Sequence, residues 1–241
     1  GEPTMSKDTW KLLDYLLEHP QQGLDIAINT NGCVEKKLID KLINKINELA
    51  AVGVKVDVYT SLESTGKQAE YARDGLNYYD WIENTERILK ETKSTVAIMT
   101  TINILSLPTF VDFIMTVMDL RKIHNTSFEW NRTPLSINIM HWPPHLQCTL
   151  LDKADRVRIA DTIENACKNW LKYYSPDKYA RIYLEEFDQI KRLCEYLRNT
   201  EPATEHRADF VRYIHAYDKR RNKNFTEVFP QYANLLEDWN G

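Results

Sequence analysis

The first half of this 241-residue chain alternates short apolar segments with longer segments in which apolar residues recur every three or four positions. The first kind is typical of buried strands, and the second is typical of amphipathic helices. Strands separated by helices pair in parallel through right-handed crossovers. The alternation therefore predicts an α/β fold built on a parallel sheet. The expected strands are residues 24–29, 54–60, 96–102 and 135–140.

The second part of the chain shows helical periodicity only. No strand pattern follows Pro143 and Pro144, which indicates a helical extension. We therefore expect an α/β part at residues 1–150 and a helical part at residues 151–241, with a polar linker candidate at 199–207. The expected helices are residues 7–19, 34–49, 79–91, 110–123, 152–174, 178–199 and 207–220.

Composition argues against several function classes. With 43% hydrophobic and 27% charged residues the chain is an ordinary globular protein, and a net charge of −4 argues against general nucleic-acid binding. Its 7 glycines form no phosphate-loop motif. No apolar run is long enough to cross a bilayer, so no membrane association is expected. The cysteines at 33, 148, 167 and 194 form no C-x-x-C pair, which favours a reducing, cytoplasmic setting.

Polar or aromatic residues follow each expected strand. Ligands of parallel α/β folds bind beyond the carboxyl ends of the strands, so these residues are the candidate site. Asn-Gly pairs and hydroxyl residues at strand ends are also ordinary turn residues, and for any single one a turn is the simpler interpretation. The same character at all these strand ends favours a site at one edge. The residues are Asn29, Thr30, Asn31, Gly32, Ser61, Glu63, Thr101, Asn103, His141 and Trp142.

Four short motifs in a fixed order carry a family resemblance. Gly-Glu-Pro stands at residues 1–3, Thr-Asn-Gly at 30–32, Ser-Leu-Glu-Ser at 61–64 and Glu-Tyr-Ala-Arg-Asp-Gly at 70–75. In this order they resemble the core of radical S-adenosylmethionine (radical SAM) enzymes, a partial parallel barrel of six βα units. The match corresponds to units two to six, over roughly residues 1–175. It implies a partial (β/α)6-type barrel without its first unit, then its last helix and a helical C-terminal extension.

The resemblance also assigns roles to single residues. Glu2 takes the place of the glutamate that contacts the amino group of the cofactor's methionine part, and Arg73 that of the arginine that clamps its carboxylate. Ser61 and Asn103 match polar residues that face the cofactor from later strands, and Glu63 stands where an aspartate is common. The implied cofactor-binding residues are Glu2, Asn29, Asn31, Ser61, Glu63, Arg73 and Asn103, and His141 and Trp142 are expected on the substrate side.

Arg73 has a simpler alternative. It stands beside Asp74 and near Asp80, and a surface ion pair with either contributes less than about 1 kcal/mol. A ligand-binding role predicts instead that Arg73 faces the same cavity as Glu2 and Ser61.

The activity that the resemblance implies is radical SAM chemistry. A [4Fe–4S] cluster reduces S-adenosylmethionine, and the resulting 5′-deoxyadenosyl radical abstracts hydrogen from a substrate. The C-x3-C-x2-C loop that binds this cluster is missing from the sequence, so we expect the ligands upstream of residue 1. An electron donor such as a flavodoxin or ferredoxin is implied, and a small-molecule, peptide or nucleotide substrate stays open. The alternatives are a non-catalytic radical SAM-like barrel that serves as a partner-binding scaffold, and an unrelated barrel enzyme.

The tail at residues 224–232 resembles the closing helix of the radical SAM branch with a shortened "twitch" extension. Such an extension can hold an auxiliary iron–sulfur cluster, which needs several closely spaced cysteines. Cys148, Cys167 and Cys194 lack that spacing, so no auxiliary cluster is expected.

Three further features have simple interpretations. His141, His145 and Cys148 could form a metal site, but two intervening prolines favour a turn. Cys33 could be a cluster ligand, and a lone cysteine is more often a buried residue. The basic run at 219–223 is interpreted as a solvated helix end.

Overall fold

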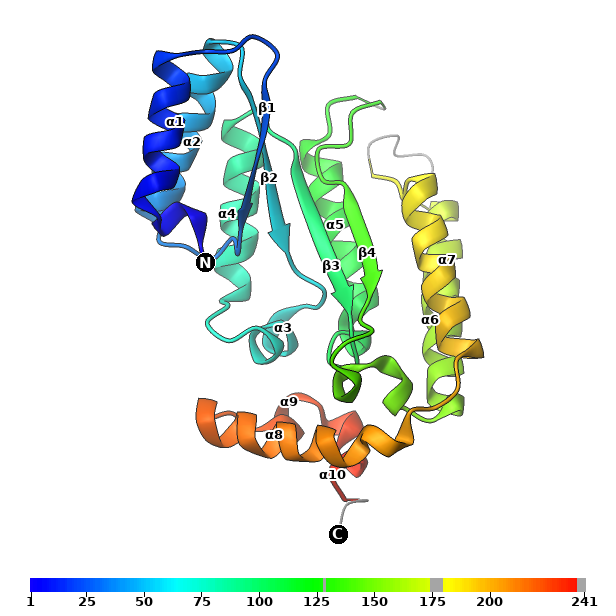
Figure 1. The fold of residues 1–241 in the computed structure, drawn as a ribbon. Helices are drawn as coiled ribbons and strands as arrows, with labels where there is room; N and C mark the ends of the chain where they lie inside the picture. Colours follow the sequence, from blue (N-terminus) through cyan, green and yellow to red (C-terminus); the bar gives the residue numbers. More distant parts are fainter. Residues whose placement is uncertain (128, 174–179, 238–241) are drawn as a thin grey trace.

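The computed structural model describes residues 1–127, 129–173 and 180–237, and its centre is a four-stranded sheet (Figure 1). The strands are β1 (Asp25–Thr30), β2 (Lys55–Ser61), β3 (Val96–Ile102) and β4 (Leu135–Ile139). They are bonded in the order β1-β2-β3-β4, and every pair is parallel. The predicted α/β class and parallel sheet are confirmed. Because neighbours in sequence are neighbours in the sheet, the arrangement is consistent with part of a βα barrel, while closure into a barrel stays a prediction.

Helices connect the successive strands. They are α2 (Lys36–Ala51), α4 (Tyr78–Glu91) and α5 (Phe110–His124), and α1 (Lys7–Glu18) packs beside α2 (Figure 1). Helix α4 is preceded by a short helix, α3 (Gly66–Ala72), which is not among the helices predicted from the sequence.

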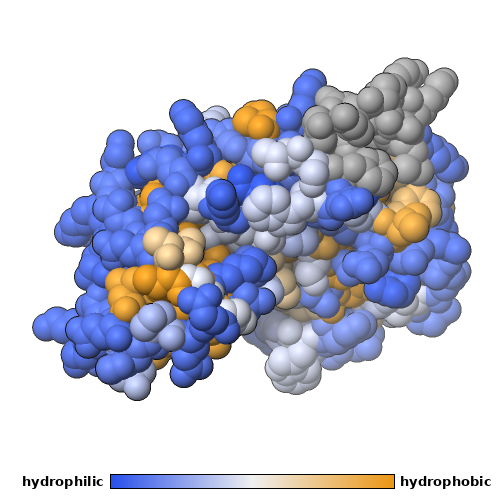
Figure 2. All heavy atoms as spheres, turned by 90° about the horizontal axis from the view of Figure 1, so that it is seen from above, coloured by the Kyte–Doolittle hydropathy of each residue, from blue (hydrophilic) through white to orange (hydrophobic). Residues whose placement is uncertain are grey.

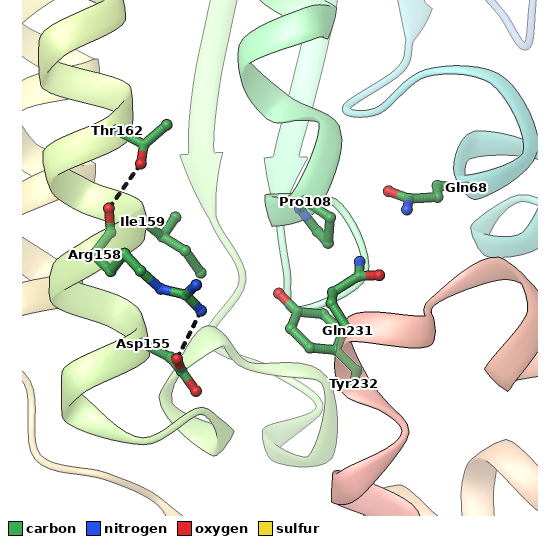
Figure 3. A pocket seen from close by; sticks show the side chains of 8 residues that line it. All are labelled: Gln68, Pro108, Asp155, Arg158, Ile159, Thr162, Gln231 and Tyr232. Carbon is green, nitrogen blue, oxygen red and sulfur yellow. Dashed lines mark hydrogen bonds and ion pairs between the residues drawn. The ribbon is translucent and has the colours of Figure 1, made fainter.

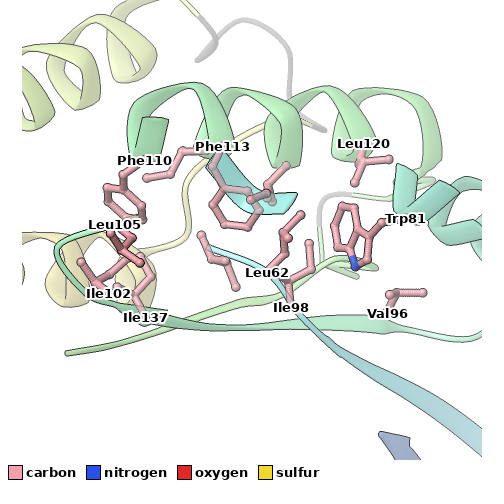
Figure 4. Close-up of a cluster of buried hydrophobic side chains, with 14 of the residues drawn as sticks. Leu62, Trp81, Val96, Ile98, Ile102, Leu105, Phe110, Phe113, Leu120 and Ile137 are labelled. Carbon is pink, nitrogen blue, oxygen red and sulfur yellow. The ribbon is translucent and has the colours of Figure 1, made fainter. Parts of the chain in front are cut away.

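The main core lies between the sheet and these helices. Figure 4 shows Ile98 and Ile102 of β3 and Ile137 of β4 gathered beneath Phe110 and Phe113 of α5. All five are buried, and burying one such side chain contributes about 1.5–3 kcal/mol to folding.

The two faces of the sheet differ in character. In β2 the side chains of Val56 and Val58 are buried against the helices, whereas the alternating Tyr59 and Ser61 are only half-buried. The first face therefore holds the sheet in place, and the second leaves polar side chains accessible near the strand ends.

The C-terminal part covers the β4 side of the sheet. Helices α6 (Lys153–Tyr173) and α7 (Leu184–Asn199) pack on each other, and α7 lies along β4 (Figure 1). The Gln189 side chain accepts a hydrogen bond from the Ile137 N–H at 2.5 Å, which occupies a donor on the exposed edge of β4.

Three more helices lie across the carboxyl ends of the strands: α8 (Arg207–Arg221), α9 (Phe225–Val228) and α10 (Asn234–Glu237) (Figure 1). The predicted helical extension is thus present. Helix α7 begins at Leu184, later than predicted, because the Glu186 carboxylate accepts from the Tyr183 N–H and starts the helix there. The predicted start at residue 178 lies outside the described residues. The 3-10 turns are η1 (Pro3–Met5), η2 (Leu107–Thr109), η3 (Pro144–Leu146), η4 (Cys148–Leu150), η5 (Thr204–His206) and η6 (Pro230–Tyr232).

The face of the molecule shown in Figure 2 is mainly hydrophilic, as expected for a chain with 27% charged residues. Apolar side chains form separate groups on it. Among the described residues, no helix has the length and apolar character needed to cross a membrane.

Buried arginines join the helices to one another. Arg121 donates through Nη2 to Glu186 Oε1 at 2.5 Å and through Nη1 to Glu186 Oε2 at 2.8 Å, and it also donates to the Thr133 carbonyl. The Arg121 and Glu186 side chains are 1% and 6% exposed. Arg132 and Arg156 donate to backbone carbonyls in the same way. The Arg121–Glu186 ion pair joins α5 to α7, and it stabilises the fold only while both partners are present.

Replacing Glu186 by alanine leaves the Arg121 guanidinium buried without its counter-charge. We expect the free energy of unfolding to fall by about 3–5 kcal/mol, measured by urea denaturation. Glu195→Ala, on the same helix, removes the exposed partner of Lys191 and is the control, with a loss below about 1 kcal/mol. Equal losses in the two variants would contradict the assignment.

Candidate functional site

Glu2 is fixed at the carboxyl end of β1 by hydrogen bonds from uncharged donors. Its Oε1 accepts from the hydroxyls of Thr4 at 2.7 Å and Thr30 at 2.8 Å, and its Oε2 accepts from the Asn31 N–H at 2.8 Å. Glu2 also caps the η1 turn, in which Pro3 occupies the first position. The carboxylate is therefore held firmly beside the strand end, and Oε2 keeps room for a further donor.

Arg73 follows α3 and forms a bidentate pair with Glu63. Its Nε donates to Glu63 Oε1 at 3.0 Å and its Nη2 donates to Glu63 Oε2 at 2.5 Å. The Glu63 side chain is 5% exposed and that of Arg73 is 34% exposed. The simpler alternative, a surface pair with Asp74 or Asp80, is wrong, and Asp74 instead pairs with Arg221. The two-bond geometry fixes the plane of the guanidinium.

A pocket of about 290 Å³ opens where these groups meet. Glu2, Ser61 and Arg73 all line it, as expected for a shared cavity. A second pocket of about 390 Å³ shares Asn31, Ser61 and Arg73 with the first, so the two adjoin. Together they are large enough for a small metabolite. The first pocket is lined by Gly1, Glu2, Asn29, Thr30, Asn31, Tyr59, Ser61 and Arg73, and the second by Asn31, Cys33, Ser61, Arg73, Asp74, Gly75 and Leu76.

The charges in the first pocket do not cancel. Glu63 neutralises Arg73, whereas Glu2 forms no ion pair within residues 1–127, 129–173 and 180–237. Arg73 Nη1 makes no hydrogen bond to the described residues and stays available. The pocket therefore offers a carboxylate to a cation, and a guanidinium N–H and the Ser61 hydroxyl to an anion.

Gly32 makes the turn that brings Asn31 to Glu2. It has φ +73°, and an added Cβ would lie 2.6 Å from Trp81 Cδ1. The Trp81 indole N–H donates to the Thr60 hydroxyl at 2.9 Å, so the ring cannot easily move away. Only glycine suits both the backbone angle and the space here.

Gly32→Ala should destabilise the fold more than Gly23→Ala. Gly23 has φ +76° but nothing within 4 Å of an added Cβ, so its variant reports the backbone strain alone, about 1–2 kcal/mol. The additional loss in Gly32→Ala measures the clash with Trp81. Urea denaturation of both variants gives the comparison, and equal losses would show that the Trp81 contact does not constrain the turn.

Cys33 borders the second pocket and is the one half-buried cysteine, since Cys148, Cys167 and Cys194 are buried. Burial raises the Cys33 pKa, and the thiol donates a hydrogen bond to the Asn77 carbonyl at 3.3 Å. Burial raises the pKa of the other three thiols to about 12.

Iodoacetamide at pH 8 should therefore modify Cys33 alone in the folded protein. Because its pKa is raised, the thiolate fraction at a given pH is lower than for a free thiol, and the rate should keep rising above the ordinary thiol pKa of about 8.5. Peptide mapping by mass spectrometry locates the label, and Cys33→Ser is the blank. A rate that levels off near pH 8.5, or equal labelling of Cys148, would contradict this.

Asn103 is engaged locally. Its Oδ1 accepts from the Leu105 N–H at 2.9 Å and its Nδ2 donates to the Thr101 carbonyl at 3.2 Å. The side chain closes the turn after β3 and lines neither of the two pockets. Its expected role in binding the cofactor stays a prediction.

His141 and Trp142 follow β4, at the opposite side of the same edge from Glu2. Both are exposed, Trp142 at 81%, and the His141 ring packs against Tyr196 at 5.8 Å. Cys148 is fully buried, and no group of three potential ligands in the described parts of the chain could hold a metal ion. The predicted turn is present as the two 3-10 turns η3 and η4.

Sequence reasoning missed Tyr59, which lines the first pocket beside Ser61. The alternation along β2 could have identified Tyr59, because it stands two residues before Ser61 and so shares its face of the sheet. It also missed Thr30 as the residue that anchors Glu2.

A third pocket, of about 430 Å³, lies apart from this site, between α6 and the η6 turn (Figure 3). The buried Tyr232 hydroxyl has no partner among the described residues. None of the residues predicted for the site lines this pocket, whose lining is Gln68, Pro108, Asp155, Arg158, Ile159, Thr162, Gln231 and Tyr232.

Comparison with known proteins gives no match: no protein-family model, curated protein or solved structure is similar to the chain.

Proposed function

We propose that the pocket between the ends of β1 and β2 binds the amino-acid part of S-adenosylmethionine, and that the chain belongs to a radical SAM enzyme. One observation carries the proposal. Glu2, Ser61 and Arg73 come from three separate segments and line one pocket. The order of the sequence motifs supports the same ligand.

The chemistry of the pocket suits a zwitterion. An ammonium group would bind the Glu2 carboxylate, which has only uncharged partners. A carboxylate would accept from Arg73 Nη1 and the Ser61 hydroxyl. Because Glu63 already holds the guanidinium in one plane, little further ordering of Arg73 is needed on binding.

The cofactor, when bound and reduced, supplies a radical that abstracts hydrogen from a substrate. These residues would orient it, and the neutral donors around Glu2 would keep that carboxylate in place. A [4Fe–4S] cluster does not suit the described residues, because no three potential ligands meet. We therefore assign no step of cluster chemistry to them, and the electron donor and substrate of the proposed enzyme stay open.

Arg73→Lys tests the proposal. Lysine keeps the positive charge but loses the planar group that binds Glu63 and the ligand together. We expect S-adenosylmethionine affinity, measured by isothermal titration calorimetry, to fall by about 1–3 kcal/mol.

Arg212→Lys is the matched control, because Arg212 is an exposed arginine on α8 that pairs with Asp209 and lines none of the pockets described above. The proposal fails if S-adenosylmethionine does not bind the unmodified protein, or if Arg73→Lys binds it as tightly as the control does.

A further inference from the structure

The C-terminal segment 217–225 holds the last turn of α3, which Arg73 directly follows. The Tyr217 hydroxyl donates to the Tyr71 carbonyl at 2.8 Å. The Lys223 ammonium donates to the Glu70 carbonyl at 2.7 Å and to the Tyr71 carbonyl at 3.3 Å. The last carbonyls of a helix have no partner within it, so these side chains satisfy groups that would otherwise be unpaired.

Asp218 of the same segment also binds α3, here as the acceptor of a hydrogen bond. Its Oδ1 accepts from the Tyr71 hydroxyl at 2.6 Å, and its Oδ2 accepts from the Phe225 N–H at 2.9 Å. Burial, followed by this hydrogen bond, raises the Tyr71 pKa, so the hydroxyl stays a donor at all ordinary pH values. The Tyr71 ring also packs against those of Phe225 and Phe229, with centroids 5.9 and 5.3 Å away.

Segment 217–225 also contacts Asp74, the residue that follows Arg73. Asp74 pairs with Arg221 at 2.7 Å and with Lys223 at 3.5 Å. Asn222, at φ +50°, turns the chain back after α8 so that Lys223 reaches α3. The basic run at 219–223 is therefore not simply a solvated helix end, as the sequence suggested, because two of its residues bind α3 and Asp74.

Segment 217–225 therefore holds the chain on both sides of Arg73, at Glu70 and Tyr71 before it and at Asp74 after it. Glu63 fixes its guanidinium, but the backbone that delivers it to the pocket is held by Tyr217, Asp218 and Lys223. We infer that segment 217–225 is a latch that positions Arg73 for the carboxylate of the ligand, with Lys223 as its main positioning residue. This inference rests on the proposed function for the identity of the ligand.

This arrangement would allow the affinity of the pocket to be regulated from outside it. Anything that displaces the latch frees the last turn of α3 and lowers the affinity for a carboxylate, without touching the pocket itself. The affinity for a ligand without a carboxylate stays the same, because Glu2 is anchored independently to the end of β1.

The test compares Lys223→Met with Lys219→Met, an exposed lysine on α8, in the full chain. Two ligands are titrated by calorimetry: S-adenosylmethionine and its decarboxylated analogue. We expect Lys223→Met to weaken the first by about tenfold and the second not at all, and Lys219→Met to change neither. In an Arg73→Ala background, Lys223→Met should cause no further loss. Equal weakening for both ligands, or none, overturns the latch.

A second readout needs no ligand. The Arg73 Nε–H, which donates to Glu63, should give a protected side-chain NMR signal that persists in Lys219→Met and is lost in Lys223→Met. Tyr217→Phe, which removes one hydroxyl and keeps the ring, should weaken that protection if Lys223→Met does not fold. Should the unmodified protein bind neither ligand, the proposed function fails. The NMR comparison then decides the latch by itself, and an unchanged Arg73 signal overturns it.

Discussion

The single direction of all four strands is the constraint on which the site depends. Parallel strands end at one edge, so residues that follow different strands are brought together without any sequence proximity. Helices occupy one face of the sheet, and the alternating residues of the other face, such as Tyr59 and Ser61, remain accessible beside that edge. The pocket thus follows from the topology, and its charges follow from which residues stand at the strand ends.

Satisfied polar contacts hold each charged group of the site in a defined place. Glu2 is held by hydroxyl and amide donors, and Arg73 by the buried Glu63. Arranging these groups before a ligand arrives reduces the entropy lost on binding. Elsewhere in the fold the Arg121–Glu186 pair has a different role, because its groups are buried away from the pocket and join two helices. Burial alone therefore does not identify a functional charge.

Strong periodicity made the strands and most helices predictable, since a buried face leaves a repeating apolar pattern. The seven residues of α3 were missed, because this short helix depends on side chains such as Lys223 that lie far along the chain. The family resemblance placed Arg73 at the same pocket as Glu2, and the simpler alternative, an ion pair with Asp74 or Asp80, is wrong. Only the folded loop shows that Glu63 lies nearer to the guanidinium than the adjacent Asp74. Asn103 shows the converse case, a polar residue at a strand end that closes its own turn.

A crystal structure of the protein soaked with S-adenosylmethionine tests the proposed site most directly. We expect the ligand's ammonium group within about 3 Å of a Glu2 carboxylate oxygen and its carboxylate at a similar distance from Arg73. Ligand density elsewhere, for example between α6 and the η6 turn, with the Glu2 pocket holding only solvent, would contradict it.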